Sequence, residues 1–292
     1  MAPTLPVAST RVPKVPIPLP DPYDFHRSTF RFRTFGRDAA SVWHDDALYR
    51  VLRSGAVVRV SADGVASDRQ TDARDEAEVL HILGASFDLE GFARAQPEIA
   101  ARAPGFRPPL VYDPFESLVT SVTAQQVSLQ SACAMRSRFV QRHGQRHELD
   151  GVEVWRFPGQ EDVAGADLEG LGLSRAKMRS IAVLAEADLD LTGLDDGEVR
   201  EHLTALPGIG GWTVDWFLAR CLGRPDAFAP GDLGVRKAVA RWFSEDDIWP
   251  EQRVREAVAP FREHANLAVH YLLAPSLGAA GTAPVTRRPA WA

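Results

Sequence analysis

The segment LPGIGGWTVDWFLARCLGRPDAFAPGDLGVRKAV, residues 206–239, carries the strongest local signals in the chain. A Pro-Gly-Ile-Gly turn comes first, and an apolar helix is expected after it over residues 212–221. A short helix ending near Ala205 precedes the turn, so the three pieces form a compact helical hairpin. Further on, a Pro-Gly turn is followed by Asp232, where another helix is expected to begin.

The glycines of the turn, Gly208, Gly210 and Gly211, allow positive φ and close approach of another molecule to the backbone. The first N–H groups of a helix have no partner within it and lie at its positive end. Such a hairpin can therefore hold a nucleic-acid phosphate without a lysine. The alternative is a plain corner between two helices that is capped by glycine.

Asp232 lies 22 residues after Gly210, at the expected start of a helix. Taken alone, an Asp in this place is ordinarily an N-cap. A helix N-terminus also stabilises an ionised carboxylate, and a reaction that develops positive charge on a sugar requires such an anion. The two roles are compatible, so Asp232 is the candidate catalytic residue.

The rest of the chain predicts an α+β fold, in which a small antiparallel-sheet N-terminal domain packs on a mostly α-helical domain. In the N-terminal region, residues 23–110, strands are expected over 29–33, 47–52 and 56–61, and a helix over 75–83. The second region, 111–274, reads as nearly all helical. The Pro-rich residues 1–22 are expected to be disordered and residues 275–292 to form a flexible tail.

Composition limits the class of protein. The net charge is −6, and all of the excess lies in residues 111–292, which counts against bulk attraction to DNA. Two local basic clusters are candidate DNA contacts or solvated helix faces: Arg136, Arg138, Arg142 and Arg146, and then Arg175, Lys177 and Arg179. Two cysteines cannot hold a four-thiolate iron–sulfur cluster. With no secretion-signal pattern and no membrane-spanning apolar run, a cytoplasmic protein is expected, associated with the nucleoid and without membrane contact.

The hairpin LPGIG followed by PGD resembles the helix-hairpin-helix glycosylase superfamily, and most closely the AlkA-type 3-methyladenine DNA glycosylases. DPFESLVTSVTAQQVS (113–128) and GLGLSRAKMRSIAVLA (170–185) resemble further segments of that family. The resemblance spans about residues 112–273. Residues 23–110, together with LPDPYDF (18–24), resemble the family's N-terminal sheet domain with lower specificity.

The resemblance implies a role for particular positions. It makes Asp232 the catalytic aspartate and places Gln126 as the wedge that fills the gap left by a flipped nucleotide. Gln126 can also be read as an ordinary polar helix end, and tryptophans at i, i+4 as packing residues. The remaining implied positions are the DNA-binding residues Gly208, Gly210, Gly211 and Thr213, the base-pocket residues Trp216 and Trp212, and carbonyls near Thr204, Leu206 and Ile209 for a monovalent cation.

Two departures from the family pattern bear on the reaction. Members that also cut the DNA backbone carry a lysine two residues after the last glycine of the Pro-Gly-X-Gly turn, where it forms a Schiff base. Trp212 stands there, which implies a monofunctional enzyme. Leu273 stands where the family often has a pocket tryptophan, so the shape of the pocket and the range of substrates are open.

The expected function is hydrolysis of the N-glycosidic bond of alkylated purines, such as 3-methyladenine and 7-methylguanine, in duplex DNA by base flipping. This is the first step of base excision repair, and a monomer is expected. The alternatives are a non-catalytic DNA-binding or damage-sensing protein and a glycosylase for oxidised or deaminated bases. Asp215 is a weaker catalytic candidate, and the i, i+4 pair His143 and His147 is a weaker metal-site candidate than a solvated face.

Overall fold

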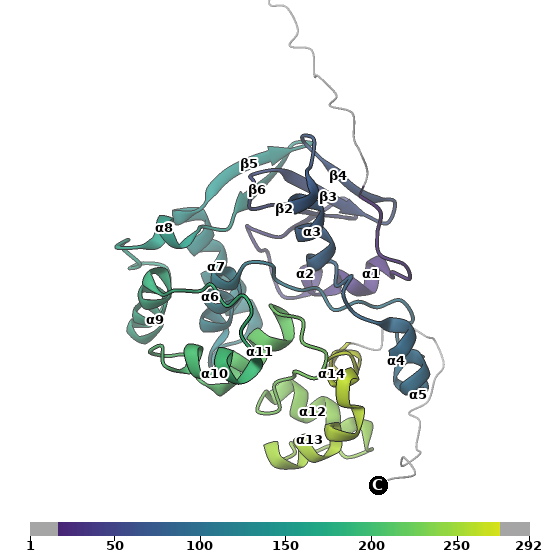
Figure 1. Cartoon of the computed structure of the whole chain (residues 1–292). Helices are drawn as coiled ribbons and strands as arrows, with labels where there is room; N and C mark the ends of the chain where they lie inside the picture. Colours follow the sequence, from purple (N-terminus) through teal and green to yellow (C-terminus); the bar gives the residue numbers. More distant parts are fainter. Residues whose placement is uncertain (1–16, 275–292) are drawn as a thin grey trace, which may run out of the picture.

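The computed structural model describes residues 17–274. Its N-terminal part is an antiparallel sheet with strand order β1-β2-β3-β4, drawn in purple and dark blue in Figure 1. The strands expected near residues 47–52 and 56–61 are confirmed, because they are the two central strands of this sheet. The strands are β1 (Val42–His44), β2 (Ala47–Val51), β3 (Val57–Ser61) and β4 (Gly64–Ser67).

The strand expected over residues 29–33 is wrong. The chain forms two short helices there, α1 (Phe25–Ser28) and α2 (Phe30–Thr34). The Asp24 side chain caps α1 by accepting a hydrogen bond from the backbone of Arg27. The Thr29 hydroxyl bonds the carbonyl of Phe25 at 2.6 Å. These local side-chain hydrogen bonds favour helical turns. The alternation of apolar and polar residues that suggested a strand covers only five residues, which is too short to outweigh them.

Residues 17–22 belong to the Pro-rich stretch for which the sequence predicts disorder, and the structure describes them. Ile17 is buried and forms an isolated antiparallel bridge with Val65. The apolar contact with the sheet explains why this end of the Pro-rich stretch is ordered. Residues 1–16 and the expected flexible tail, 275–292, lie outside the described residues.

Helices make up most of the remaining chain (Figure 1). Ser128, Ser174 and Asp195 each cap a helix with their side chains. Within residues 17–274, no helix is long and apolar enough to cross a membrane. The helices are α3 (Ala73–Ile82), α4 (Leu89–Ala95), α5 (Pro97–Ala100), α6 (Pro114–Ala124), α7 (Leu129–His143), α8 (Gln160–Val163), α9 (Arg175–Glu186), α10 (Asp196–Thr204), α11 (Gly211–Arg220), α12 (Leu233–Trp242), α13 (Glu251–Val258), the 3₁₀ helix η1 (Ala259–His264) and α14 (Ala265–Leu273).

A β-hairpin interrupts the region that reads as helical. Strands β5 (Gln145–Leu149) and β6 (Val152–Arg156) pair antiparallel across an Asp-Gly turn. That dipeptide between two alternating segments is a hairpin signal that the helical interpretation passed over. Val152 and Val154 bury their side chains against the N-terminal sheet. The hairpin therefore extends the contact between the sheet and the helices.

Two apolar cores lie side by side in the helical part, and α11 belongs to both. Trp216 and Ala219 face a core built from α4, α5 and α12–α14. Val214 and Phe217 face a second core built mainly from α6, α7, α9 and α10. The two faces of α11 thus pack against different cores, which fixes the position of this helix and of the side chains along it.

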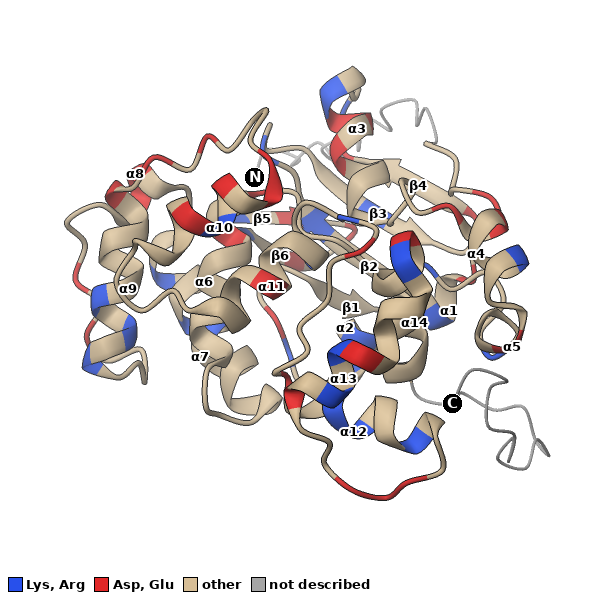
Figure 2. Ribbon diagram, turned by 60° about the horizontal axis from the view of Figure 1, so that its bottom comes forward, with Lys and Arg blue, Asp and Glu red and all other residues tan. Residues whose placement is uncertain are grey.

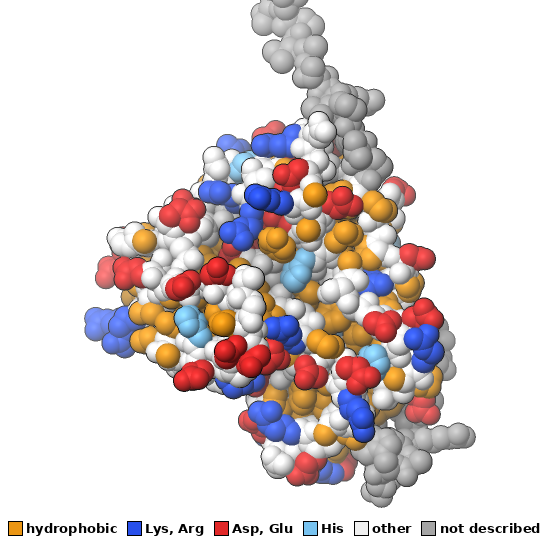
Figure 3. Space-filling model, in the orientation of Figure 1, with side chains coloured by type: hydrophobic (Ala, Val, Ile, Leu, Met, Phe, Trp, Pro, Cys, Tyr) orange, Lys and Arg blue, Asp and Glu red, His pale blue; other side chains and the backbone are white. Residues whose placement is uncertain are grey.

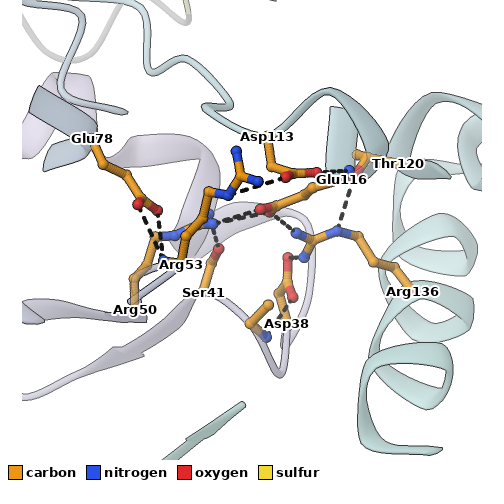
Figure 4. Close-up of polar contacts among 10 residues, drawn as sticks. Asp38, Ser41, Arg50, Arg53, Glu78, Asp113, Glu116, Thr120 and Arg136 are labelled. Carbon is orange, nitrogen blue, oxygen red and sulfur yellow. Dashed lines mark hydrogen bonds and ion pairs between the residues drawn. The ribbon is translucent and has the colours of Figure 1, made fainter. Parts of the chain in front are cut away.

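A buried polar network joins the N-terminal sheet to α6 and α7 (Figure 4). Glu116 of α6 accepts hydrogen bonds from Arg50 of β2 at 2.9 and 3.0 Å and also from Arg136 of α7. Arg136 pairs with Asp38 as well, and its Nε donates to Thr120 at 3.0 Å. Burial raises the pKa of Glu116, but the two guanidinium groups outweigh that effect and hold the pKa below its usual value.

A second carboxyl at this junction, that of Glu78 of α3, is expected to make the free energy of unfolding depend on pH. Burial raises its pKa from 4.5 to about 7, against an opposing hydrogen bond from the backbone of Arg53. The folded state then holds the proton more tightly than the unfolded state. Its stabilising contribution is complete below about pH 4.5 and is lost as the pH rises to about 7.

We therefore expect Glu78→Gln to remove part of the loss of stability between pH 5 and pH 8. With solvent screening, the difference is on the order of 1–2 kcal/mol. Denaturant unfolding of both proteins at the two pH values measures it. Equal pH dependence in wild type and variant would show that Glu78 is not the group responsible.

Candidate active site

The carboxylate of Asp232 lies at the start of α12, where it caps the helix. Its Oδ1 accepts hydrogen bonds from the backbone N–H groups of Gly234 at 2.8 Å and Val235 at 3.1 Å. The N-cap interpretation of the sequence is therefore confirmed. These bonds fix the side-chain rotamer and leave the second oxygen to point elsewhere.

That second oxygen, Oδ2, faces α11. It accepts hydrogen bonds from the indole N–H groups of Trp212 at 3.0 Å and Trp216 at 3.2 Å. The two tryptophans are one helical turn apart, so their N–H groups converge on one point. Four donors thus orient Asp232, which is half-buried. A fixed anion in a partly buried site can stabilise positive charge that develops beside it.

Two further residues belong to this site, and the sequence reasoning missed them. The guanidinium carbon of Arg220 lies 3.6 Å from the centre of the Trp216 ring, and His270 of α14 meets the same ring edge-on. Trp216 itself is only 4% exposed, so Arg220 covers one of its faces. The i, i+4 spacing from Trp216 to Arg220 was the available signal.

Leu273, the departure from the family pattern, lies at the end of α14 and close to the start of α12. A Cβ added to Gly234 would come within 3.4 Å of its side chain. Leu273 is therefore near Asp232, as a pocket residue would be. Asp215 points elsewhere, because it is buried and pairs with Arg200 at 2.8 Å.

The metal-site hypothesis for His143 and His147 fails on geometry. His143 ends α7 and His147 lies in β5, so the helical spacing between them does not exist. Within residues 17–274, no cluster of three or more His, Cys, Asp or Glu side chains could hold a metal ion.

The glycine hairpin joins α10 to α11 as expected. Gly208 has a φ of +83°, and a Cβ there would lie 2.0 Å from the hydroxyl oxygen of Ser180. Gly210 is the N-cap of α11 and makes no side-chain cap bond. A Cβ at Gly210 or Gly211 would meet nothing within 4 Å. Gly208 is thus needed by the fold, whereas the space at the other two is open to an approaching molecule.

This difference predicts separate effects of alanine at two glycines. Gly208→Ala forces a positive φ and a contact with Ser180, so we expect a loss of about 1–3 kcal/mol in the free energy of unfolding. Gly210→Ala is expected to stay within about 1 kcal/mol of wild type and to weaken DNA binding instead. Denaturant unfolding and titration with a duplex measure the two effects. Equal stability of the two variants would contradict this assignment.

The turn between α6 and α7 is tied to the hairpin. Gln125 donates hydrogen bonds to the carbonyl of Gly208 at 3.1 Å and to the hydroxyl of Thr213 at 3.2 Å. Lys177 holds the end of α6 by donating to the carbonyl of Thr123 at 2.8 Å. Gln126 is exposed with a φ of +56°. A wedge at Gln126 would therefore project from a turn held on two sides.

Thr213 is only 1% exposed, so its side chain does not face DNA as the sequence implied. Its hydroxyl orients Gln125 instead. The contribution of Gln125 was missed, because adjacent glutamines give no signal of which one turns inward.

Basic residues gather on particular helices, although the net charge of the chain is negative. Figure 2 shows blue segments on α9 and α12 and red segments on α8 and α10. On the face in Figure 3, acidic and basic side chains are mixed. Arg175 and Arg179 are exposed on α9. The other sequence cluster is used within the protein, since Arg138 and Arg142 bond carbonyls of the loop before α9 and Arg146 pairs with Glu153.

Comparisons with known proteins agree with this geometry. Residues 119–263 match the family model described as HhH-GPD superfamily base excision DNA repair protein. The chain is 30% identical over 209 residues to Escherichia coli DNA-3-methyladenine glycosylase 2, covering 67% of this chain and 72% of that protein. It is 38% identical over 176 residues to a probable bifunctional transcriptional activator/DNA repair enzyme AlkA of Mycobacterium tuberculosis, covering 58% of this chain.

The chain spans only 34% of the length of that mycobacterial protein. Among solved structures, a 3-methyladenine DNA glycosylase from Archaeoglobus fulgidus superposes with a TM-score of 0.75 at 24% identity, covering 86% of this chain and 94% of that one. That likeness supports the fold, and the sequence relatives support the family. The chain belongs to the AlkA-type branch of the HhH-GPD superfamily of base excision DNA repair proteins.

Proposed function

We propose that this protein is a monofunctional DNA glycosylase that hydrolyses the N-glycosidic bond of alkylated purines in duplex DNA and leaves an abasic site. The observation that carries the proposal is the Asp232 carboxylate, held by the indoles of Trp212 and Trp216 beside the hairpin. Binding alone would not require an anion there, because a carboxylate repels a phosphate backbone. The name of the Escherichia coli relative points to the same lesion class.

In this scheme the damaged nucleotide leaves the duplex, which costs a few kcal/mol and less at a damaged pair. Gln126 fills the gap, and the open backbone at Gly210 and Gly211 receives a phosphate. An alkylated purine is already cationic, so it departs with the bonding electron pair as a neutral base. Asp232 stabilises the oxocarbenium-like sugar, and water adds at C1′ and releases its proton.

The absence of lyase activity rests on Trp212. A lyase needs an amine at this point to form a Schiff base with the sugar. The indole of Trp212 occupies the position and donates to Asp232. Hydrolysis should therefore end at the abasic site, with the backbone intact.

A monovalent cation fits the loop before α11 as a further proposal. Within the described chain, the carbonyls of Thr204 and Ile209 accept no backbone hydrogen bond, while the carbonyl of Leu206 accepts one from Ile209 at 3.1 Å. Neutral carbonyl oxygens are suitable ligands for a hard cation. Thr204, Leu206 and Ile209 would hold it and support the hairpin, and it would take no part in bond breaking.

Incubation of the protein with methylated duplex DNA tests the function. We expect free 3-methyladenine and 7-methylguanine, abasic sites, and strand breaks only after alkali is added. Binding without release of any base would favour a damage-sensing protein, and breaks without alkali would overturn the monofunctional assignment. We also propose that the enzyme acts as a monomer on nucleoid DNA in the cytoplasm, since one chain supplies every group named.

A further inference from the structure

A single side chain joins the turn between α6 and α7 to the glycine hairpin. The amide nitrogen of Gln125, at the end of α6, donates to the carbonyl of Gly208 at 3.1 Å and to the hydroxyl of Thr213 at 3.2 Å. A carbonyl only accepts, so the nitrogen of the amide must face it. Within residues 17–274, no backbone N–H donates to the carbonyl of Gly208. Gln125 therefore supplies the hydrogen bond that this carbonyl makes within the protein.

Both acceptors belong to the hairpin and lie on either side of its open backbone. Gly208 is in the turn, with a φ of +83°. Thr213 is in the first turn of α11, where its own N–H bonds the carbonyl of Gly210 at 2.9 Å. In the described part of the chain, the N–H groups of Gly210 and Gly211 donate no backbone hydrogen bond. Gln125 thus holds the hairpin on both sides of the two N–H groups that are open to a phosphate.

The turn between α6 and α7, called the wedge turn below because it carries Gln126, is fixed from a second direction. Gln126 has a φ of +56° and an exposed side chain. Lys177 of α9 donates to the carbonyl of Thr123, just before the turn, at 2.8 Å. Ser180, one turn further along α9, lies against Gly208. The same helix therefore supports both the wedge turn and the hairpin.

Extrusion of a nucleotide needs two contacts at once, because the phosphate must be held while a wedge enters the base stack. Groups that are held at the right separation before DNA binds do not have to be ordered in the complex. We propose that Gln125 is a positioning residue that sets the separation between the hairpin and a wedge at Gln126, so that extrusion of the nucleotide depends on it and cleavage of the glycosidic bond does not. This inference rests on the proposed glycosylase function.

The catalytic candidate is separate from this link. Asp232 lies at the start of α12, and its hydrogen bonds come from the indoles of α11 and from the backbone of α12. Gln125 takes part in none of them. Loss of the Gln125 link should therefore leave the carboxylate in place for a nucleotide that has already left the stack.

A merely structural role would lower the rate on every substrate by the same factor, so the test compares two duplexes that differ in the cost of extrusion. Each carries a single 7-methylguanine, opposite cytosine in one duplex and opposite a stable abasic analogue in the other. Extrusion costs a few kcal/mol for the paired lesion and less for the lesion without a partner base. Single-turnover release at saturating protein is measured on both. The paired-to-unpaired ratio of the rates does not depend on the fraction of protein that is folded.

Three variants break the link in different ways. Gln125→Leu keeps the approximate size of the side chain and removes both hydrogen bonds. Gln125→Glu keeps the shape, but a carboxylate cannot donate to the carbonyl of Gly208. Thr213→Val removes one acceptor and leaves the bond to Gly208 in place. Thermal unfolding of each variant shows that the protein is folded.

Gln160→Leu is the matched control. The amide nitrogen of Gln160 also bridges two carbonyls, those of Leu184 and Ala187, each at 2.8 Å. These carbonyls lie at the C-terminal end of α9, away from Lys177 and the wedge turn. The control therefore loses the same kind of link without loosening the wedge turn or the hairpin.

We expect the paired-to-unpaired ratio to fall at least about tenfold in Gln125→Leu and Gln125→Glu, which corresponds to about 1.4 kcal/mol, while release of the unpaired lesion changes less than about threefold. Thr213→Val should lower the ratio by less, and Gln160→Leu should leave it unchanged. Adding Thr213→Val to Gln125→Leu should not lower the ratio further, because the bond is already lost.

Equal losses on the two duplexes, or no loss on either, in the Gln125 variants overturn the inference and leave the proposed function standing. A ratio that falls equally in Gln160→Leu also overturns it, because any loosening of the helices would then have the same effect. Wild type that releases no base from either duplex overturns the proposed function and this inference together.

Discussion

Asp232→Asn should lower base release by about 10²–10³-fold, the usual cost of removing one preorganised electrostatic stabiliser. Asn ranks with Asp as an N-cap, so its amide oxygen can still accept from Gly234 and Val235. Its amide nitrogen would then face the indole N–H groups of Trp212 and Trp216. The variant therefore loses the anion and its orientation while the start of α12 keeps its cap.

Single-turnover release from methylated duplex DNA measures the effect. Unfolding free energy should stay within about 1 kcal/mol of wild type, and binding to a duplex with a stable abasic analogue checks that DNA is still held. Asp232→Ala is the matched comparison, because it removes the cap as well as the charge. Asp232→Asn activity within about threefold of wild type would rule out a catalytic role for the carboxylate.

Glu116→Gln should have the largest effect on stability. The carboxylate lies between Arg50 and Arg136, and its side chain is only 5% exposed. The substitution removes one charge from a buried network and leaves the two guanidinium groups less compensated. Breaking a buried ion pair in this way costs about 3–5 kcal/mol. Because the network joins β2 to α6 and α7, the loss is expected in a single cooperative transition.

Denaturant unfolding measures this cost, and Glu90→Gln is the control. Glu90 pairs with Arg94 on the surface, with side chains 82% and 69% exposed. Exposed pairs contribute about 0–1 kcal/mol, so Glu90→Gln should change little. Similar losses in the two variants would mean that the buried network does not stabilise the junction.

Local signals in the sequence predicted the helices on either side of the glycine turn and the start of the helix after Asp232. Ser128, Ser174 and Asp195 cap helices because capping is a bond to a backbone N–H three residues away. Local signals gave a wrong prediction for residues 29–33, where a short alternation of apolar and polar residues suggested a strand. They also hid the hairpin of β5 and β6, whose valines are buried by a sheet far away in the sequence.

The residues of the candidate site also fall into two groups, those that local signals in the sequence predict and those that they do not. Asp232 and the glycine turn could be found from residue types and spacing, since an N-cap and a positive-φ turn are local requirements. The sequence could not show which of the glycines tolerates no other residue, because the side chain that a Cβ at Gly208 would meet belongs to Ser180 on another helix. Nor could the sequence show that Gln125 turns inward to Thr213 while Gln126 stays exposed.

By itself, the sequence determined the helical hairpin, the cap at Asp232 and the family, because these depend on neighbours along the chain. The tertiary structure alone decided what surrounds the carboxylate. It brought the indoles of Trp212 and Trp216 onto Asp232, and it set Arg220 and His270 behind Trp216. Those contacts join α11, α12 and α14, and they arise from burial of shared apolar surface, whose partners no local pattern names.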